Sequence, residues 1–181
     1  MMDLDTTASC RIFLIGFMCA GKSQVGKALA PLLELNFVDI DRVVEQRVGP
    51  LAPFIQREGE AAFRVHESNV LDDLLKGGTA VISTGGGTPC VGDNLQRMNS
   101  AGITVWLDVP MAHLMSRIER AGGDRPLLFG LKGPALHERV RTLMEEREGF
   151  YAQAQIIVQA TDPIPVVAER IKMALKTIHT K

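Results

Sequence analysis

The sequence predicts an α/β protein: a three-layer sandwich in which helices cover both faces of a central five-stranded parallel sheet. Short apolar runs alternate along the chain with longer stretches of helical periodicity, and this alternation is typical of βαβ units. The 181 residues have the length of one ordinary domain and contain no internal repeat. We therefore expect a single domain over residues 1–181.

The expected strands are the apolar runs at residues 11–16, 36–40, 79–83, 103–107 and 155–159. Between them, helical periodicity is clearest in the apolar residues from Val65 to Leu75. Pro31 lies where the first helix should still be running, so we expect a kink or an early end there. Asp162 followed by Pro163 predicts an N-cap and a first-turn proline for the last helix.

The composition excludes several classes of protein. Hydrophobic residues make up 46% of the chain, which excludes disorder, and 20 basic against 21 acidic residues argue against nucleic-acid binding. No apolar run approaches the roughly 18 residues of a membrane span, and the acidic start MMDLD is unlike a signal peptide. The three cysteines form no CxxC pair, so we expect neither a zinc ribbon nor a disulfide scaffold, and we expect a cytoplasmic protein.

Residues 16–23, GFMCAGKS, match the phosphate-binding pattern G-x-x-x-x-G-K-[ST] between an expected strand and an expected helix. Gly16 and Gly21 allow the backbone to wrap so that its N–H groups point at phosphate oxygens. Lys22, expected to be an exposed loop lysine, can reach the β- and γ-phosphates, and the Ser23 hydroxyl can bind Mg²⁺. The positive end of the following helix faces the same anion. This segment predicts a nucleotide site.

Two carboxylates, Asp39 and Asp41, follow the second expected strand in the segment FVDIDR. Being two residues apart, they project to the same side if they belong to a strand, at the carboxyl edge where α/β sheets bind ligands. One can hold Mg²⁺, for which we favour Asp39, and the other can orient or deprotonate an attacking hydroxyl. The alternative for Asp41 is a helix N-cap.

Residues 121–134, AGGDRPLLFGLKGP, are too polar and glycine-rich for a core segment, yet they include Leu127, Leu128 and Phe129. This mixture predicts a mobile flap that covers something apolar or flat. A plain surface loop is the alternative.

Six segments in one order make the chain resemble the shikimate kinases, small P-loop enzymes of the nucleoside-monophosphate-kinase-like type. The resemblance runs from about residue 11 to about residue 175, and its segments are GFMCAGKSQVGKALA, FVDIDRVVEQRVG, IQREGEAAFRVHE, TGGGTP, DRPLL and EEREGFY. It implies a P-loop kinase fold with a substrate-binding region at about 41–70 and a mobile lid at about 121–134. It also implies transfer of the γ-phosphoryl group of ATP to the 3-hydroxyl of shikimate, in aromatic amino acid biosynthesis.

The resemblance assigns roles residue by residue. The implied catalytic residues are Lys22, Asp41 and Arg125, and the implied Mg²⁺ ligands are Ser23 and Asp39. The implied ATP-binding residues are Gly16, Cys19, Ala20, Gly21, Lys22, Ser23, Gln24, Arg120 and Arg125. The implied shikimate-binding residues are Asp41, Arg64, Gly85, Gly86, Gly87 and Arg147. Cys19 stands where glycine would be easier, and Gln24 replaces a hydroxyl residue common in the family.

Alternatives remain at the level of single residues and of the whole chain. Arg64 and Arg147 could be solvated arginines on helix surfaces, and the Gly85–Gly87 triplet could be a flexible turn. Glu67, three residues after Arg64, could orient it or form a surface ion pair. The competing functions are another small-metabolite kinase such as a gluconate kinase, a nucleotide-dependent switch, and a nucleotide-binding pseudoenzyme. A switch of the GTPase kind would need an Asn-Lys-x-Asp segment that reads guanine, and this sequence contains none. We expect a monomer whose partners are small molecules.

Overall fold

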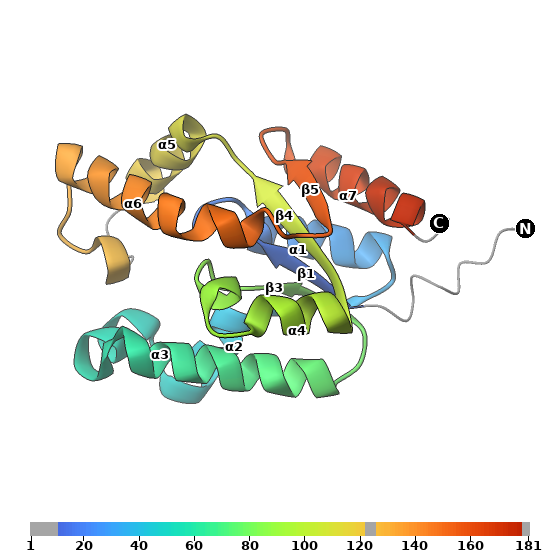
Figure 1. Ribbon diagram of the computed structural model, residues 1–181, viewed down its shortest axis with the longest axis horizontal. Helices are drawn as coiled ribbons and strands as arrows, with labels where there is room; N and C mark the ends of the chain where they lie inside the picture. Colours follow the sequence, from blue (N-terminus) through green and yellow to red (C-terminus); the bar gives the residue numbers. More distant parts are fainter. Residues whose placement is uncertain (1–10, 122–125, 179–181) are drawn as a thin grey trace, which may run out of the picture.

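The computed structural model describes residues 11–121 and 126–178, and its sheet has the predicted architecture (Figure 1). Five parallel strands are arranged in the order β2-β3-β1-β4-β5. They are β1 (Arg11–Ile15), β2 (Asn36–Asp39), β3 (Ala80–Ser83), β4 (Gly102–Asp108) and β5 (Ile156–Gln159). Each lies within about two residues of an expected apolar run. The central strands β1, β3 and β4 are buried on both faces, which makes them continuously apolar.

Helices form the outer layers. They are α1 (Lys22–Leu32), α2 (Ile40–Val48), α3 (Leu51–Lys76), α4 (Asn94–Ala101), α5 (Met111–Ala121), α6 (Gly133–Tyr151) and α7 (Ile164–Ile178), with the short 3₁₀ turns η2 (Thr88–Cys90) and η3 (Pro126–Leu128). Helices α1 and α7 pack together on one face of the sheet, and α4 and α6 cross the other (Figure 1). The side chains of Phe13, Val81 and Val105 from the three central strands are fully buried between these layers.

The helix starts differ in detail from the expectation. Helix α2 begins at Ile40, directly after β2, and its N-cap is Asp39, whose carboxylate accepts from the Arg42 N–H at 3.5 Å. Asp41 therefore lies in the first turn of α2, and the expectations that it extends the strand or caps the helix are both wrong. No loop separates strand from helix here, so the change in backbone period comes one residue earlier than the apolar pattern indicated.

The two prolines give different outcomes. Helix α1 ends at Leu32, one residue beyond Pro31, which agrees with the expected early end. Helix α7 begins at Ile164, and the Pro163 carbonyl accepts from the N–H groups of Val166 and Val167. The predicted N-cap at Asp162 is therefore wrong by one residue. The Asp162 carboxylate instead pairs with Arg170, 2.7 Å away and two turns along the helix.

Helix α3 is interrupted at Gly59, whose φ of 85° and ψ of 164° are not helical. Glycine adopts this conformation without the clash that a Cβ brings. The break separates a first segment from a second one, which carries Glu60, Arg64 and Glu67 at helical spacing along one face. Within residues 11–121 and 126–178, no helix is both long and apolar enough to cross a membrane.

Candidate active site

The glycine-rich loop connects β1 to α1, as the motif predicts. Gly16 has a φ of 136°, and a Cβ there would lie 3.0 Å from the Leu107 carbonyl oxygen, so the loop passes too close to β4 for a side chain. The Lys22 ammonium donates to the carbonyl oxygens of Gly16 and Phe17, at 2.8 Å each. With 8% of its surface exposed, Lys22 is buried, which corrects the expectation of an exposed loop lysine. The curl of the loop encloses the side chain.

A second basic group, Arg117 on α5, supports the loop from outside. Its guanidinium donates to the carbonyl oxygens of Cys19 (3.2 Å), Ala20 (3.3 Å) and Ala160 (3.1 Å). The sequence reasoning selected Arg120, one turn further along α5, and missed Arg117. Arg120 is exposed, and its guanidinium binds the Ser116 carbonyl and hydroxyl at 3.0 Å each. Only the fold shows that Arg117 faces the loop.

Cys19 adopts a left-handed backbone conformation, with a φ of 62°. A side chain in this conformation costs roughly 1 kcal/mol relative to glycine. We expect Cys19→Gly to raise the free energy of unfolding by about 1 kcal/mol, measured by urea denaturation, with little change in activity. Cys90→Ala is the matched control, because Cys90 is the other partly buried free thiol of the described chain and has an ordinary backbone. A destabilised Cys19→Gly variant would show that the thiol contributes packing that outweighs the backbone strain.

The structure brings together the two residues predicted to hold Mg²⁺. The Ser23 hydroxyl donates to Asp39 Oδ2 at 2.5 Å, at the carboxyl edge of the sheet. Both residues line a cavity of about 480 Å³, together with Lys22, Asp41 and Arg117. One carboxylate and one hydroxyl beside a phosphate site suit Mg²⁺, which takes its remaining ligands from phosphates and water. The described residues contain no cluster of three or more His, Cys, Asp or Glu side chains arranged for a metal ion.

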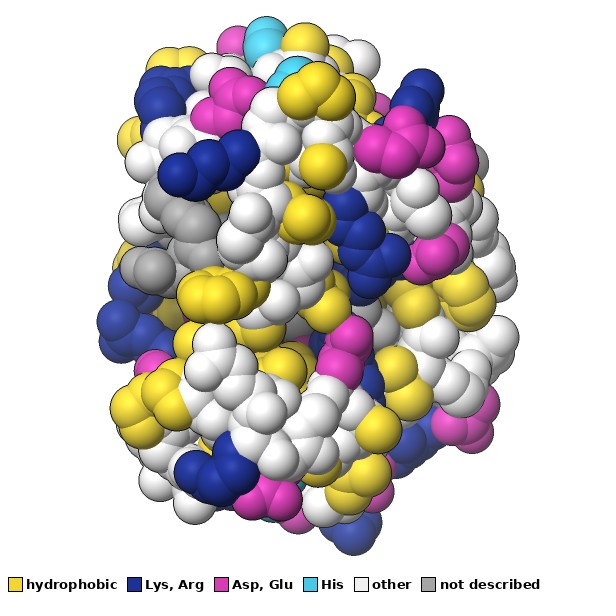
Figure 2. Space-filling model, turned by 90° about the vertical axis from the view of Figure 1, so that its left-hand side faces the viewer, with side chains coloured by type: hydrophobic (Ala, Val, Ile, Leu, Met, Phe, Trp, Pro, Cys, Tyr) yellow, Lys and Arg dark blue, Asp and Glu magenta, His cyan; other side chains and the backbone are white. Residues whose placement is uncertain are grey.

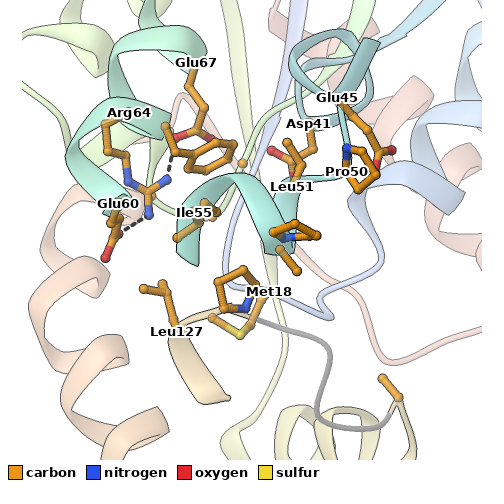
Figure 3. A pocket seen from close by; sticks show the side chains of 18 of the residues that line it. Met18, Asp41, Glu45, Pro50, Leu51, Ile55, Glu60, Arg64, Glu67 and Leu127 are labelled. Atoms are coloured by element: carbon orange, nitrogen blue, oxygen red, sulfur yellow. Dashed lines mark hydrogen bonds and ion pairs between the residues drawn. The ribbon is translucent and has the colours of Figure 1, made fainter. Parts of the chain in front are cut away.

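A second cavity, of about 580 Å³, adjoins the first. Asp41, Arg64, the Gly85–Gly87 triplet and Arg147 all line it, so the residues that the resemblance assigned to substrate converge in space. Hydrophobic side chains gather around a hollow on this face (Figure 2). In the close-up, Arg64 lies between Glu60 and Glu67, and Asp41 projects from α2 (Figure 3). Met18 and Leu127 lie across the pocket from Glu67 and Asp41.

The glycine triplet is defined by close approaches and is not merely a flexible turn. A Cβ on Gly85 would collide with Glu67 Oε1 and would lie 3.0 Å from Asp41 Oδ1. A Cβ on Gly87 would lie 2.6 Å from Arg64 Nη2. The Gly86 carbonyl accepts from the Tyr151 hydroxyl at 2.5 Å. Charged side chains therefore press against bare backbone at Gly85 and Gly87, and alanine cannot replace either glycine without displacing them.

Arg64 belongs to a partly buried ion-pair network, which excludes the reading of a solvated arginine. Its guanidinium donates to Glu67 Oε2 and, at 2.6 Å, to Glu60 Oε1. Glu67 is 1% exposed, so its pairing with Arg64 is not a surface ion pair. Burial alone lowers the pKa of the Arg64 guanidinium, but the pairing with Glu67 and Glu60 raises it overall, so the group stays charged.

Arg147 approaches the glycine triplet from α6 and is also buried. Its guanidinium carbon lies 5.8 Å from the centre of the Phe17 ring, and Nη1 would be 3.5 Å from a Cβ on Gly86. Burial raises the pKa of the neighbouring Tyr151 phenol against the opposing effect of Arg147, so this residue is a neutral hydrogen-bond donor. The cavity thus has an arginine on each side of the triplet.

Asp41 lies at the junction of the two cavities and lines both. Burial, reinforced by the nearby Glu67 carboxylate and opposed by Lys22, raises its pKa from 3.8 to about 6. Its Oδ1 atom is buried without a hydrogen-bond partner. A buried carboxylate oxygen without a donor, in a cleft and with a raised pKa, is typical of a catalytic group.

The predicted lid is described only in part. Pro126 and Leu127 line the larger cavity, Leu128 is buried, and Phe129 is exposed. Arg125, predicted to be catalytic, lies outside the described residues. The apolar residues of this segment therefore divide between lining the cavity, packing into the fold and facing solvent.

Comparison with known proteins identifies the family. The model of the shikimate kinase family matches residues 18–176. A shikimate kinase from Bacteroides fragilis is 46% identical over 151 residues, which cover 81% of this chain and 83% of that protein. The structure of a shikimate kinase from Acinetobacter baumannii in complex with shikimate aligns with a TM-score of 0.87 and 30% identity, over 97% of both chains.

The gluconate kinase alternative does not survive this comparison. A gluconokinase from Sinorhizobium meliloti aligns with a TM-score of 0.64 at 15% identity, which shows a shared fold alone. The family match and the related sequences, in contrast, cover most of the chain. This chain belongs to the shikimate kinase family, and its activity is the ATP-dependent phosphorylation of shikimate in the pathway to the aromatic amino acids.

Proposed function

We propose that the chain transfers the γ-phosphoryl group of ATP to the 3-hydroxyl of shikimate across the junction of the two cavities. The observation that carries this proposal is the position of Asp41, which lines both cavities and whose Oδ1 atom is buried without a hydrogen-bond partner. The glycine-rich loop supports a phosphate site in the smaller cavity, and the paired arginines support an acid site in the larger one. In-line transfer requires these two ligands to meet where Asp41 lies.

In the nucleotide half, the backbone N–H groups of residues 16–21 bind the phosphates, and Lys22 moves from the carbonyl oxygens of Gly16 and Phe17 to the β- and γ-phosphates. Ser23 and Asp39 hold Mg²⁺, which neutralises charge on the phosphates when bound. Ala20 and Gly21 complete the loop, and Gln24 lies in the first turn of α1. Arg117 holds the loop carbonyls, so that the N–H groups turn toward the anion.

In the acid half, Arg64 and Arg147 bind the carboxylate of shikimate, and the Gly85–Gly87 backbone contacts the ring hydroxyls. A guanidinium offers two parallel donors, which match a carboxylate better than an ammonium does. The A. baumannii relative was crystallised with shikimate. Asp41 accepts the proton of the attacking hydroxyl, and kcat/KM should therefore fall on the acid side of about pH 6, where Asp41 becomes protonated.

For residues 121–134 we propose a lid that closes over both ligands, in which Arg125 neutralises charge on the transferring phosphoryl group and Arg120 lies near the adenine. Hydrogen exchange with and without ATP and shikimate tests the closure, and equal protection in both states would contradict it. We also propose a cytoplasmic monomer, which size-exclusion chromatography with light scattering tests for its oligomeric state.

Replacing either arginine should weaken the acid far more than the nucleotide. We expect Arg64→Ala and Arg147→Ala to raise the KM for shikimate by about tenfold to a hundredfold, because each removes a charge-assisted fork. The KM for ATP should change little. Arg141→Ala is the control, since Arg141 is exposed on the same helix as Arg147 and forms its ion pair with Glu138, which is also exposed.

A shikimate analogue without the carboxylate separates binding from general damage. It should bind the wild-type protein weakly and lose little further affinity in either variant. If removal of the carboxylate from the ligand costs as much affinity in the variants as in the wild type, the arginines bind something else. Steady-state assays with shikimate and gluconate, followed by phosphorus NMR of the product, test the proposed substrate and the phosphorylated position together.

A further inference from the structure

Thr88, the first residue of the turn η2, has a hydroxyl that the proposed reaction does not use. Its side chain is fully buried, at 0% exposure, and Oγ1 donates to Glu67 Oε1 at 2.8 Å. The other oxygen of the same carboxylate, Oε2, accepts from Arg64. The two oxygens of Glu67 thus have different partners, one on the substrate arginine and one on Thr88.

We propose that Thr88 is a positioning residue of the shikimate pocket, whose hydroxyl fixes Glu67 and thereby holds Arg64 in the orientation that binds the substrate carboxylate. This inference rests on the proposed role of Arg64. Thr88 acts through Glu67 and does not touch the substrate itself.

The geometry around Glu67 shows why one hydroxyl matters. A carboxylate can rotate to meet a guanidinium with both oxygens, which is the favoured bidentate pairing. Thr88 occupies one oxygen and so leaves Arg64 a single contact with Glu67, through Nη1, while Nη2 donates to Glu60. Each of these nitrogens has a second N–H, so part of the guanidinium fork is available to a ligand. Without the Thr88 hydroxyl, Glu67 is free to take a second N–H of Arg64, and the substrate carboxylate must compete with it.

The backbone of Thr88 is itself held by a second contact, which restrains the point from which its side chain projects. The side-chain amide of buried Asn94 donates to the Thr88 carbonyl at 3.0 Å. Arg97 then donates to Asn94 Oδ1 at 3.3 Å and pairs with Asp72. Asp72 lies on α3, the helix that carries Glu67, so the chain of contacts returns to the element from which it started. These contacts tie the turn η2 to α3 at a second place, beside the hydrogen bond between Thr88 and Glu67.

The test compares Thr88→Val, which keeps the shape and removes the donor, with Thr88→Ser, which keeps the donor. We expect Thr88→Val to raise the KM and the calorimetric dissociation constant for shikimate about tenfold, the order of one hydrogen bond to a charged group. The KM for ATP should stay within about twofold of wild type, and Thr88→Ser should recover most of the shikimate affinity. Thr142→Val is the control, since Thr142 lies on α6 and its hydroxyl donates to the Glu138 carbonyl of its own helix.

A double-mutant cycle locates the effect. In an Arg64→Ala background, Thr88→Val should cause little further loss of shikimate affinity, because the group it positions is gone. The carboxylate-free analogue should bind Thr88→Val and wild type equally. If Thr88→Val does not fold, Thr88→Ala takes its place in the same cycle, with thermal unfolding as the check on folding.

The outcomes separate this proposal from the one on which it rests. If Arg64→Ala leaves shikimate affinity unchanged, the role of Arg64 is wrong and the proposal for Thr88 falls with it. If Arg64→Ala weakens shikimate but the Thr88 donor makes no difference, only the positioning role is overturned. Additive losses, or equal losses for shikimate and the analogue, would also overturn it, because they indicate a general structural effect.

Discussion

Lys22→Met should lower kcat by at least about 10²–10³-fold, the cost of removing one preorganised donor from developing negative charge. In the structure the ammonium donates to two loop carbonyls, so it lies inside the loop and needs only a short movement to reach a phosphate. Methionine has a similar length but neither charge nor donors. Steady-state turnover with saturating ATP and shikimate measures the loss.

The stability of Lys22→Met provides an internal check. Because Lys22 is buried, the substitution removes its donors from the carbonyl oxygens of Gly16 and Phe17, of which Phe17 keeps the N–H of Ala20 at 3.2 Å. We expect a loss of about 1–3 kcal/mol in the free energy of unfolding. Lys27→Met, on the exposed side of the same helix, should change neither turnover nor stability. Near-normal turnover in Lys22→Met would contradict the assignment of this loop to the phosphates.

The sheet could be predicted from local sequence because its strands differ most from their surroundings. The run containing Phe13 and Leu14 is apolar throughout, and both residues are fully buried in β1. Helix boundaries were harder, because caps depend on single residues. Asp39 and Asp41 both suit a cap, and only the turn of the backbone directly after β2 selects Asp39.

The site could be predicted where a motif is local and could not where contacts join distant segments. The glycine-rich loop consists of eight consecutive residues, so the local sequence is sufficient to predict its conformation. Glu67 and Thr88 are 21 residues apart, and Arg117 reaches Cys19 across 98 residues. The local sequence around an arginine on a helix, or a threonine after glycines, does not indicate that its partner lies on another element. Burial, which turns Glu67 from a surface carboxylate into a fixed one, is likewise a property of the packed fold.

Asp41→Asn should lower the activity of the protein and raise its stability. An amide cannot accept the proton of the substrate hydroxyl, so we expect kcat to fall by about 10²–10⁴-fold, the usual contribution of a general base. Asp39→Asn is the matched control two residues away. Asparagine caps a helix as well as aspartate does, and we expect that variant to change mainly the dependence of the rate on Mg²⁺ concentration. Identical kinetic profiles for the two variants would contradict the division of roles.

The stability gain of Asp41→Asn follows from the raised pKa of Asp41, which is about 6 in the fold against 3.8 as the ordinary value. Below about pH 3 the carboxyl is protonated in both folded and unfolded chains, so it adds no pH-dependent cost. Between the two pKa values the unfolded chain ionises first, and the stability of the wild type falls as the pH rises. Above about pH 6 the full cost is present, and it is of the order of 3 kcal/mol. Burying the new amide has a cost of its own, which reduces the gain.

We therefore expect Asp41→Asn to be more stable than wild type by about 1–3 kcal/mol at about pH 8, and the difference to shrink toward zero at about pH 4. Urea unfolding of wild type, Asp41→Asn and Asp39→Asn at both pH values measures this. A gain that is the same at both would mean that the charge of Asp41 is not what the fold opposes.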